Sequence, residues 1–140
     1  MTVKEYLSLV KLKQEQITEK EEYIARLRRS LEIIGIDYDR DSVQTSPDGD
    51  KYADTFGKIM EAETDLIKMK KMFVNFRVKV LDMIQKLPEK KHRDVLQYVY
   101  LDYMKLKKCA VIMGFSYDYV RELHLEALKA FEQKFPQQFD

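Results

Sequence analysis

The sequence predicts an all-α protein: a long antiparallel helical hairpin followed by a C-terminal helix-turn-helix domain. Only 4 glycines and 3 prolines interrupt 140 residues, and 35% of the residues are charged, a composition typical of long solvated helices. Apolar residues recur every three or four positions through two long segments, whereas the strict alternation of a surface strand is absent. We expect the hairpin to span residues 1–87 and the helix-turn-helix domain to span residues 88–140.

The first helix is expected over about residues 2–34. Thr2 is placed to cap its start, and Glu5, three positions later, is the matching partner in a capping box. Gly35 follows the last apolar turn and is predicted to end the helix in a left-handed conformation. The apolar seam of this helix consists of Val3, Leu7, Val10, Ile17, Ile24 and Leu31.

Residues 36–49 (IDYDRDSVQTSPDG) are expected to form the loop of the hairpin, because Asp, Ser, Pro and Gly favour turns. The spacing of four aspartates in this segment resembles that of a calcium-binding loop, but Ser42 stands where such a loop needs glycine. The last of the four is also too short to replace the bidentate glutamate of that motif. We therefore expect no calcium site. The aspartates concerned are Asp37, Asp39, Asp41 and Asp48.

The second helix is expected over about residues 50–87, and Pro88 ends it because the residue before a proline avoids the helical conformation. Its apolar stripe is broad. Two helices of this length cannot hide their stripes in a small globule, so we expect them to pack on each other like a coiled coil and to form a homodimer. The stripe consists of Tyr52, Phe56, Ile59, Leu66, Phe73, Val80, Ile84 and Leu87, widened by Met69, Phe76 and Met83.

The C-terminal segment has the pattern of three shorter helices. Pro88 suits the first helical position of the first of them. Gly114 is predicted to end the second helix in a left-handed conformation, and Ser116 to cap the third. The small Ala110 lets the second and third helices cross closely. Helix, tight turn, cap and helix in this order indicate a helix-turn-helix. The three helices are expected over residues 89–100, 106–113 and 117–133.

The stretch from Lys105 to Phe131, KLKKCAVIMGFSYDYVRELHLEALKAF, resembles region 4 of bacterial sigma factors. The whole chain is similar to the sigma-like regulators of Gram-positive phages and prophages, of the ArpU and RinA type. This resemblance implies a DNA-binding transcriptional regulator of phage or mobile-element origin, with double-stranded DNA as its partner. The positions that carry the resemblance to region 4 are Leu106, Cys109, Ala110, Ser116, Val120, Arg121, Ala127 and Leu128.

The resemblance also implies which side chains face DNA. The helix after Ser116 would enter the major groove, and two of its exposed side chains are acidic, so attraction to the phosphates must come from elsewhere. Residues 66–108 carry twelve basic and four acidic side chains. The base side is expected to be Tyr117, Asp118, Arg121 and Glu122. The phosphate side is expected to be Lys90, Lys91, Arg93, Lys105, Lys107 and Lys108.

The remaining chemistry-bearing residues predict neither catalysis nor a metal site. Cys109, the single cysteine, falls on the apolar face of a short helix and is expected in the core. His92 and His124 have no cysteine or acid pair at metal-ligand spacing, and we expect His124 at the surface or near phosphate. No glycine-rich phosphate loop, nucleophile elbow or zinc-protease motif occurs. We expect no enzyme activity and no cofactor.

The location expected from the sequence is the cytoplasm. The N-terminus begins with mixed charge and lacks the apolar segment of a signal peptide. No apolar run approaches the roughly 20 residues that a membrane span needs. A single cysteine fits a reducing compartment.

Two other functions agree with the same pattern. One is a sigma-like module that docks on RNA polymerase and has little affinity for DNA of its own. The other is a small, terminase-type DNA-packaging subunit, since such subunits also join a helix-turn-helix to an oligomerising helical region.

Overall fold

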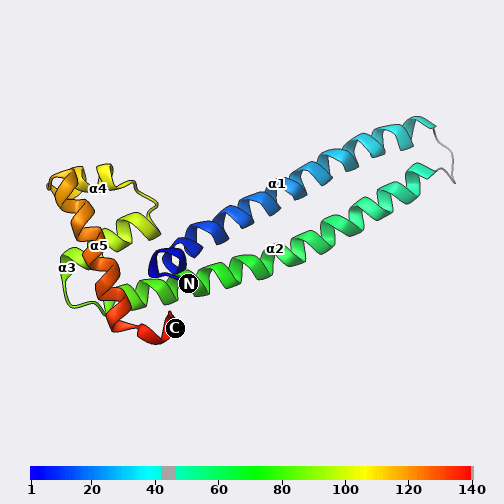
Figure 1. Cartoon of the computed structure of the whole chain (residues 1–140). Helices are drawn as coiled ribbons and strands as arrows, with labels where there is room; N and C mark the ends of the chain where they lie inside the picture. Colours follow the sequence, from blue (N-terminus) through cyan, green and yellow to red (C-terminus); the bar gives the residue numbers. More distant parts are fainter. Residues whose placement is uncertain (42–46, 140) are drawn as a thin grey trace. The chain divides into compact units, whose positions relative to one another are not determined.

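The computed structural model of the chain describes residues 1–41 and 47–139, and the side chains of residues 1–35 and 49–139. Every regular element in these ranges is helical, so the all-α prediction is confirmed (Figure 1). The α-helices are α1 (Val3–Asp41), α2 (Pro47–Gln85), α3 (Lys90–Leu96), α4 (Leu106–Met113) and α5 (Tyr117–Lys134). A π-helical segment, η1 (Gln97–Leu101), follows α3, and a 3₁₀ turn, η2 (Pro136–Gln138), follows α5.

The packing divides the described residues into two compact units. The hairpin unit consists of residues 15–72, and the core unit consists of residues 1–14 and 73–139. This division differs from the one expected at residue 87. The reason is that the first turns of α1 and the last turns of α2 share a hydrophobic core with the C-terminal helices.

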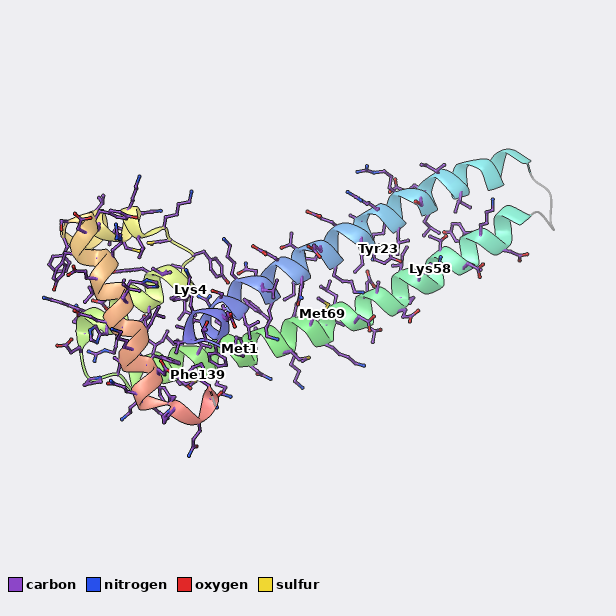
Figure 2. All side chains as sticks on the ribbon, viewed as in Figure 1. Met1, Lys4, Tyr23, Lys58, Met69 and Phe139 are labelled. Carbon is purple, nitrogen blue, oxygen red and sulfur yellow. The ribbon has the colours of Figure 1, made fainter. Side chains whose placement is uncertain are left out.

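In the hairpin unit, α1 and α2 run antiparallel and bury a narrow apolar seam. Ile17 and Ile24 of α1 and Ile59 and Ala62 of α2 are buried. Ion pairs link the two helices at the edges of the seam, Lys20 to Asp65 at 3.8 Å and Arg28 to Glu63. Figure 2 shows the side chains of this unit, with Tyr23, Lys58 and Met69 labelled.

The broad stripe predicted for α2 is wrong at its N-terminal end. Tyr52 and Phe56 are 42% and 48% exposed. A pair of helices covers only the residues that face the partner, so the outer part of a broad stripe stays in contact with solvent. The hairpin unit therefore leaves large apolar side chains uncovered.

The predicted connection over residues 36–49 is also too long. Helix α1 continues to Asp41 and α2 already begins at Pro47. Gly35 does not end α1, and a side chain there would contact Tyr52 of α2. The helix continues through this local stop signal because a glycine inside a helix costs only about 1 kcal/mol, and Pro47 is tolerated as a first helical residue. Asp37, Asp39 and Asp41 lie in helical backbone, unlike a calcium loop, and the side chains of all four aspartates are outside the described residues.

In the core unit, the predicted start of α1 is confirmed. Thr2 Oγ1 accepts a hydrogen bond from the Glu5 amide at 3.1 Å, and the Glu5 carboxylate accepts one from the Thr2 amide at 3.2 Å. The turns that follow are buried against α2 and the C-terminal helices. The largest fully buried side chains of this core are Leu7, Val10, Val80, Ile84, Leu87, Val95, Leu96, Cys109, Val120 and Phe131.

An aromatic cluster joins the N-terminal turns of α1 to the end of the described chain. The Tyr6 ring packs edge-on against Phe76 at 5.4 Å and against Phe139 at 5.5 Å between ring centroids. Its hydroxyl donates to Met83 Sδ at 3.7 Å. Edge-to-face pairs of this kind stabilise beyond the area they bury, so the C-terminal segment is held against α1 and α2.

The helix predicted over residues 89–100 is shorter than expected. Glu89 is the N-cap of α3, so Pro88 lies before the helix and not at its first position. After Leu96 the backbone widens into η1, where the Asp102 amide donates to the Gln97 carbonyl at 2.9 Å. Tyr103 then takes a positive φ of 57°. Such π-segments and left-handed non-glycine residues are uncommon and are enriched at functional sites.

Candidate nucleic-acid interface

A tight turn joins α4 to α5, as the sequence predicts. Gly114 has φ 74°, and its amide donates to the Val111 carbonyl at 3.3 Å while the next amide, of Phe115, donates to the Ala110 carbonyl at 3.0 Å. This is a Schellman motif, which ends a helix with a left-handed residue. Ser116 then caps α5, its Oγ accepting from the Tyr119 amide at 3.2 Å.

Small and apolar residues hold α4 and α5 together. Cys109 and Ala110 on α4 are buried, as are Val120 and Ala127 on α5. Both α3 and α4 pack against α5. The core position predicted for Cys109 is confirmed, and burial raises the pKa of its thiol, with a smaller contribution from the charge of Asp102. The thiol therefore stays protonated and unreactive.

The four residues expected on the base side are all exposed on the first turns of α5. Tyr117 is 40% exposed, and Asp118, Arg121 and Glu122 are exposed as well. Arg121 Nη1 lies 4.0 Å from Asp118 Oδ1, and the Arg121 guanidinium lies 5.8 Å from the centre of the Tyr117 ring. The structure thus places these side chains on one outward face without burying any of them.

Lysines from two other helices reach this end of α5. Lys107 of α4 lies 5.9 Å from the centre of the Tyr117 ring. Lys91 of α3 donates a hydrogen bond to the Tyr119 hydroxyl at 3.2 Å and lies over the Phe115 ring at 5.2 Å. Tyr117 and Tyr119 are two positions apart on α5, and side chains at that spacing point about 200° apart around the helix axis. Positive charge therefore flanks the start of α5 on two sides.

The other four residues expected on the phosphate side differ in their surroundings. Lys105 and Lys108 are exposed at the start of α4, and Lys90 is exposed but lies 3.5 Å from the Asp94 carboxylate. Arg93 is engaged elsewhere. Its guanidinium donates to the carbonyls of Leu87 at 2.6 Å and Pro88 at 3.0 Å. This arrangement makes Arg93 a clamp for the turn between α2 and α3.

The surface position expected for His124 is wrong. His124 is only 8% exposed, and its Nε2 lies 2.7 Å from the hydroxyl of Tyr100. Burial lowers the pKa of His124, and the positive charge of Lys4 lowers it further, so the imidazole is neutral. Burial also raises the pKa of Tyr100 to about 12. The tyrosine comes from η1, an element that a regular helical periodicity does not reveal.

Sequence reasoning also missed two lysines of α1. Lys4 and Lys11 line the same cavity as Lys105 and Lys107 in the core unit, which brings residues about one hundred positions apart into one basic region. Figure 2 labels Lys4 at the start of α1. The heptad seam of α1 shows which of its residues are buried. It carries no signal for which distant elements lie beside the polar face of the helix.

His92 of α3 lies close to α5. Its Nε2 is buried and lies 3.2 Å from the Glu89 carboxylate and 3.8 Å from that of Glu126, without the alignment of a hydrogen bond. No group of three or more His, Cys, Asp or Glu side chains within the described ranges is placed to hold a metal ion.

No protein-family model, curated protein or solved structure matches this chain. The resemblance to sigma-factor region 4 and to phage regulators therefore stays a prediction based on the residues quoted above. Within residues 1–41 and 47–139, none of the helices combines the length and the apolar character needed to span a bilayer.

Proposed function

We propose that this protein is a DNA-binding transcriptional regulator of the phage or mobile-element type, which reads the major groove with the first turns of α5. One observation carries the proposal. The left-handed Gly114 and the Ser116 cap set α5 against α4 while Tyr117, Asp118, Arg121 and Glu122 stay exposed. In helix-turn-helix proteins the N-terminal residues of the second helix contact the edges of the bases.

The exposed side chains have complementary partners in the groove. Arg121 can donate two hydrogen bonds to guanine, and Asp118 and Glu122 can accept from the amino group of cytosine. Tyr117 can contact a thymine methyl group. The ion pair between Arg121 and Asp118 does not prevent this, because side chains that are 60% and 92% exposed are held only weakly together.

Affinity would come from the lysines around α5. Lys91 and Lys107 lie on two sides of the start of α5. The two sugar-phosphate backbones likewise lie on the two sides of the major groove, so each lysine would be near one of them. Lys90, Lys105 and Lys108 add to this positive charge. We assign Arg93 mainly to the fold, since its Nη1 donates to two backbone carbonyls and only Nη2 and Nε are left for a phosphate.

We further propose that the protein acts as a homodimer through α2. This helix carries exposed apolar side chains at intervals of seven residues, Met60, Ile67, Val74 and Leu81. A seven-residue apolar repeat on an uncovered helix face is the pattern of a coiled-coil seam. Two copies would supply the two recognition helices that a palindromic operator requires.

The direct test selects binding sites from a random duplex library and then measures affinity by fluorescence anisotropy. We expect enrichment of a defined sequence. Substitution Arg121→Ala should cost roughly 1–3 kcal/mol at that sequence and relax the preference at one base pair. The control is Lys58→Ala, which removes an exposed charge from the hairpin unit and should leave affinity unchanged.

The salt dependence of DNA affinity distinguishes contacts to the phosphates from contacts to the base edges. The variant Lys107→Ala should weaken binding to all sequences and reduce the slope of log affinity against log salt by about 1. Binding without sequence preference, or full affinity in Arg121→Ala, would contradict the assignment of α5 as the recognition helix.

A second candidate function is docking on RNA polymerase. It is favoured by the acidic Asp118 and Glu122 and by an apolar pair on α4, Val111 and Ile112, which are 81% and 47% exposed. Retention of the chain on purified bacterial RNA polymerase without DNA would support this candidate if Val111→Ser abolishes it. Retention that needs DNA would favour the DNA-reading function instead.

A further inference from the structure

The core unit contains a cavity of about 600 Å³ between the first turns of α1, the segment from η1 to α4, and α5. Its volume lies within the range of small-molecule sites. Two uncommon backbone features border it, since the Tyr100 side chain comes from the π-helical segment and Tyr103 has a positive φ. The DNA-reading face does not account for a cavity of this size.

The charge around the cavity is of one sign. Lys4, Lys11, Lys105 and Lys107 line it, and none of the described residues that line it is acidic. Within the described part of the chain, none of these lysines forms an ion pair. Four positive charges around one cavity repel one another, and an anion placed among them would relieve that repulsion.

The wall of the cavity includes a buried polar pair. Tyr100 and His124 are 6% and 8% exposed and share one hydrogen bond of 2.7 Å. When both groups are neutral, the pair has two hydrogen-bond donors, the hydroxyl of Tyr100 and one ring N–H of His124. One of these two donors is used in the bond between them. One donor therefore remains, either the hydroxyl or the second ring nitrogen, and it can serve an acceptor atom of a ligand.

Apolar side chains form another part of the lining. Val99, Met104 and Leu106 face the same cavity. A fully hydrated inorganic ion gains nothing from such a surface, whereas an apolar or aromatic body is stabilised by the burial of its surface. The ligand that fits both parts of the lining carries a strongly charged head and an apolar body.

We propose that this cavity binds a small organic phosphate, a phosphate monoester of an apolar or aromatic group. The dianionic head has several acceptor oxygens for the lysines and for the Tyr100–His124 pair, and lysine is a common phosphate ligand. The apolar body lies against Val99, Met104 and Leu106. This site shares Lys105, Lys107 and Tyr117 with the proposed DNA-reading face and extends beyond that face to Lys4 and Lys11 of α1.

The test is isothermal titration calorimetry of the full chain without DNA, at constant ionic strength. The probes are phenyl phosphate, inorganic phosphate and phenol. We expect phenyl phosphate to bind with one site per chain and at least about tenfold more tightly than either of the other two, because only it satisfies both the charged and the apolar lining.

The variant Lys4→Gln combined with Lys11→Gln should weaken phenyl phosphate binding at least about tenfold, whereas Lys58→Gln should not. A lysine in the first turn of a helix opposes the helix dipole, so loss of Lys4 should not impair folding. Equal, weak binding of all three probes, or unchanged binding in the double variant, would overturn the proposal. Because no DNA is present, either result leaves the proposed function to its own test.

Discussion

At the scale of single residues, His124 couples folding to pH. Burial beside Lys4 lowers the pKa of its imidazole below the ordinary 6.5, so the folded protein holds it neutral. Between the lowered pKa of the folded protein and 6.5, the unfolded chain binds more protons at this residue than the folded chain, so the free energy of unfolding falls as pH falls through that range. Above pH 6.5 both states are neutral at this residue, and its contribution is constant.

The corresponding prediction is a loss of acid sensitivity in His124→Gln. Glutamine can keep a hydrogen bond to the Tyr100 hydroxyl but does not titrate. Urea unfolding between pH 5 and 7 should therefore show a smaller dependence on pH in the variant than in the wild type. The other histidine, His92, is present in both proteins and cancels in the comparison. An unchanged slope would show that His124 does not titrate differently on folding.

At the scale of helices and turns, two glycines are predicted to respond in opposite directions to the same substitution. Gly114 ends α4 with φ 74°, where a side chain is strained although there is space for it. Gly114→Ala should therefore destabilise the protein by about 1 kcal/mol. Gly57 lies inside α2 with open space around it, and Gly57→Ala should stabilise by roughly 0.5–1 kcal/mol.

Urea midpoints of the two variants measure both effects, and each variant is the control for the other. If both variants changed the free energy of unfolding in the same direction, the turn between α4 and α5 would not depend on the left-handed residue. In that case the position of Ser116 and of the recognition helix after it would need another explanation.

At the scale of the whole molecule, the uncovered apolar repeat on α2 is the basis of the proposed homodimer. Sedimentation velocity should detect a dimer, and Val74→Glu should shift it toward monomer because a buried, unpaired charge is costly at a coiled-coil seam. The control is Asn75→Glu, which adds the same charge one position away on another face of the helix. A monomer in the wild type would contradict the proposed dimer, and a large ring would favour a packaging subunit.

Sequence patterns were sufficient to predict the local elements of the candidate interface, namely the bounds of α4 and the turn and cap that follow it. Helix α4 has the predicted bounds, and both Gly114 and Ser116 have the predicted conformations, because caps and left-handed stops depend on residues next to one another. The exposure of Tyr117 and Arg121 agrees with what the resemblance to sigma-factor region 4 implies. By contrast, Gly35 does not end α1, because a glycine inside a helix costs only about 1 kcal/mol and does not by itself stop the helix.

By itself, the sequence determined that the chain is helical and where α4 and α5 begin. Only the tertiary structure decided that the ends of α1 and α2 belong to the core of the C-terminal helices, that His124 is buried against Tyr100, and that Lys4 joins the lysines of α4 around one cavity. The physical reason is the range of the interactions involved. Periodicity and capping act over a few residues, whereas burial and charge clustering depend on residues brought together from distant parts of the chain.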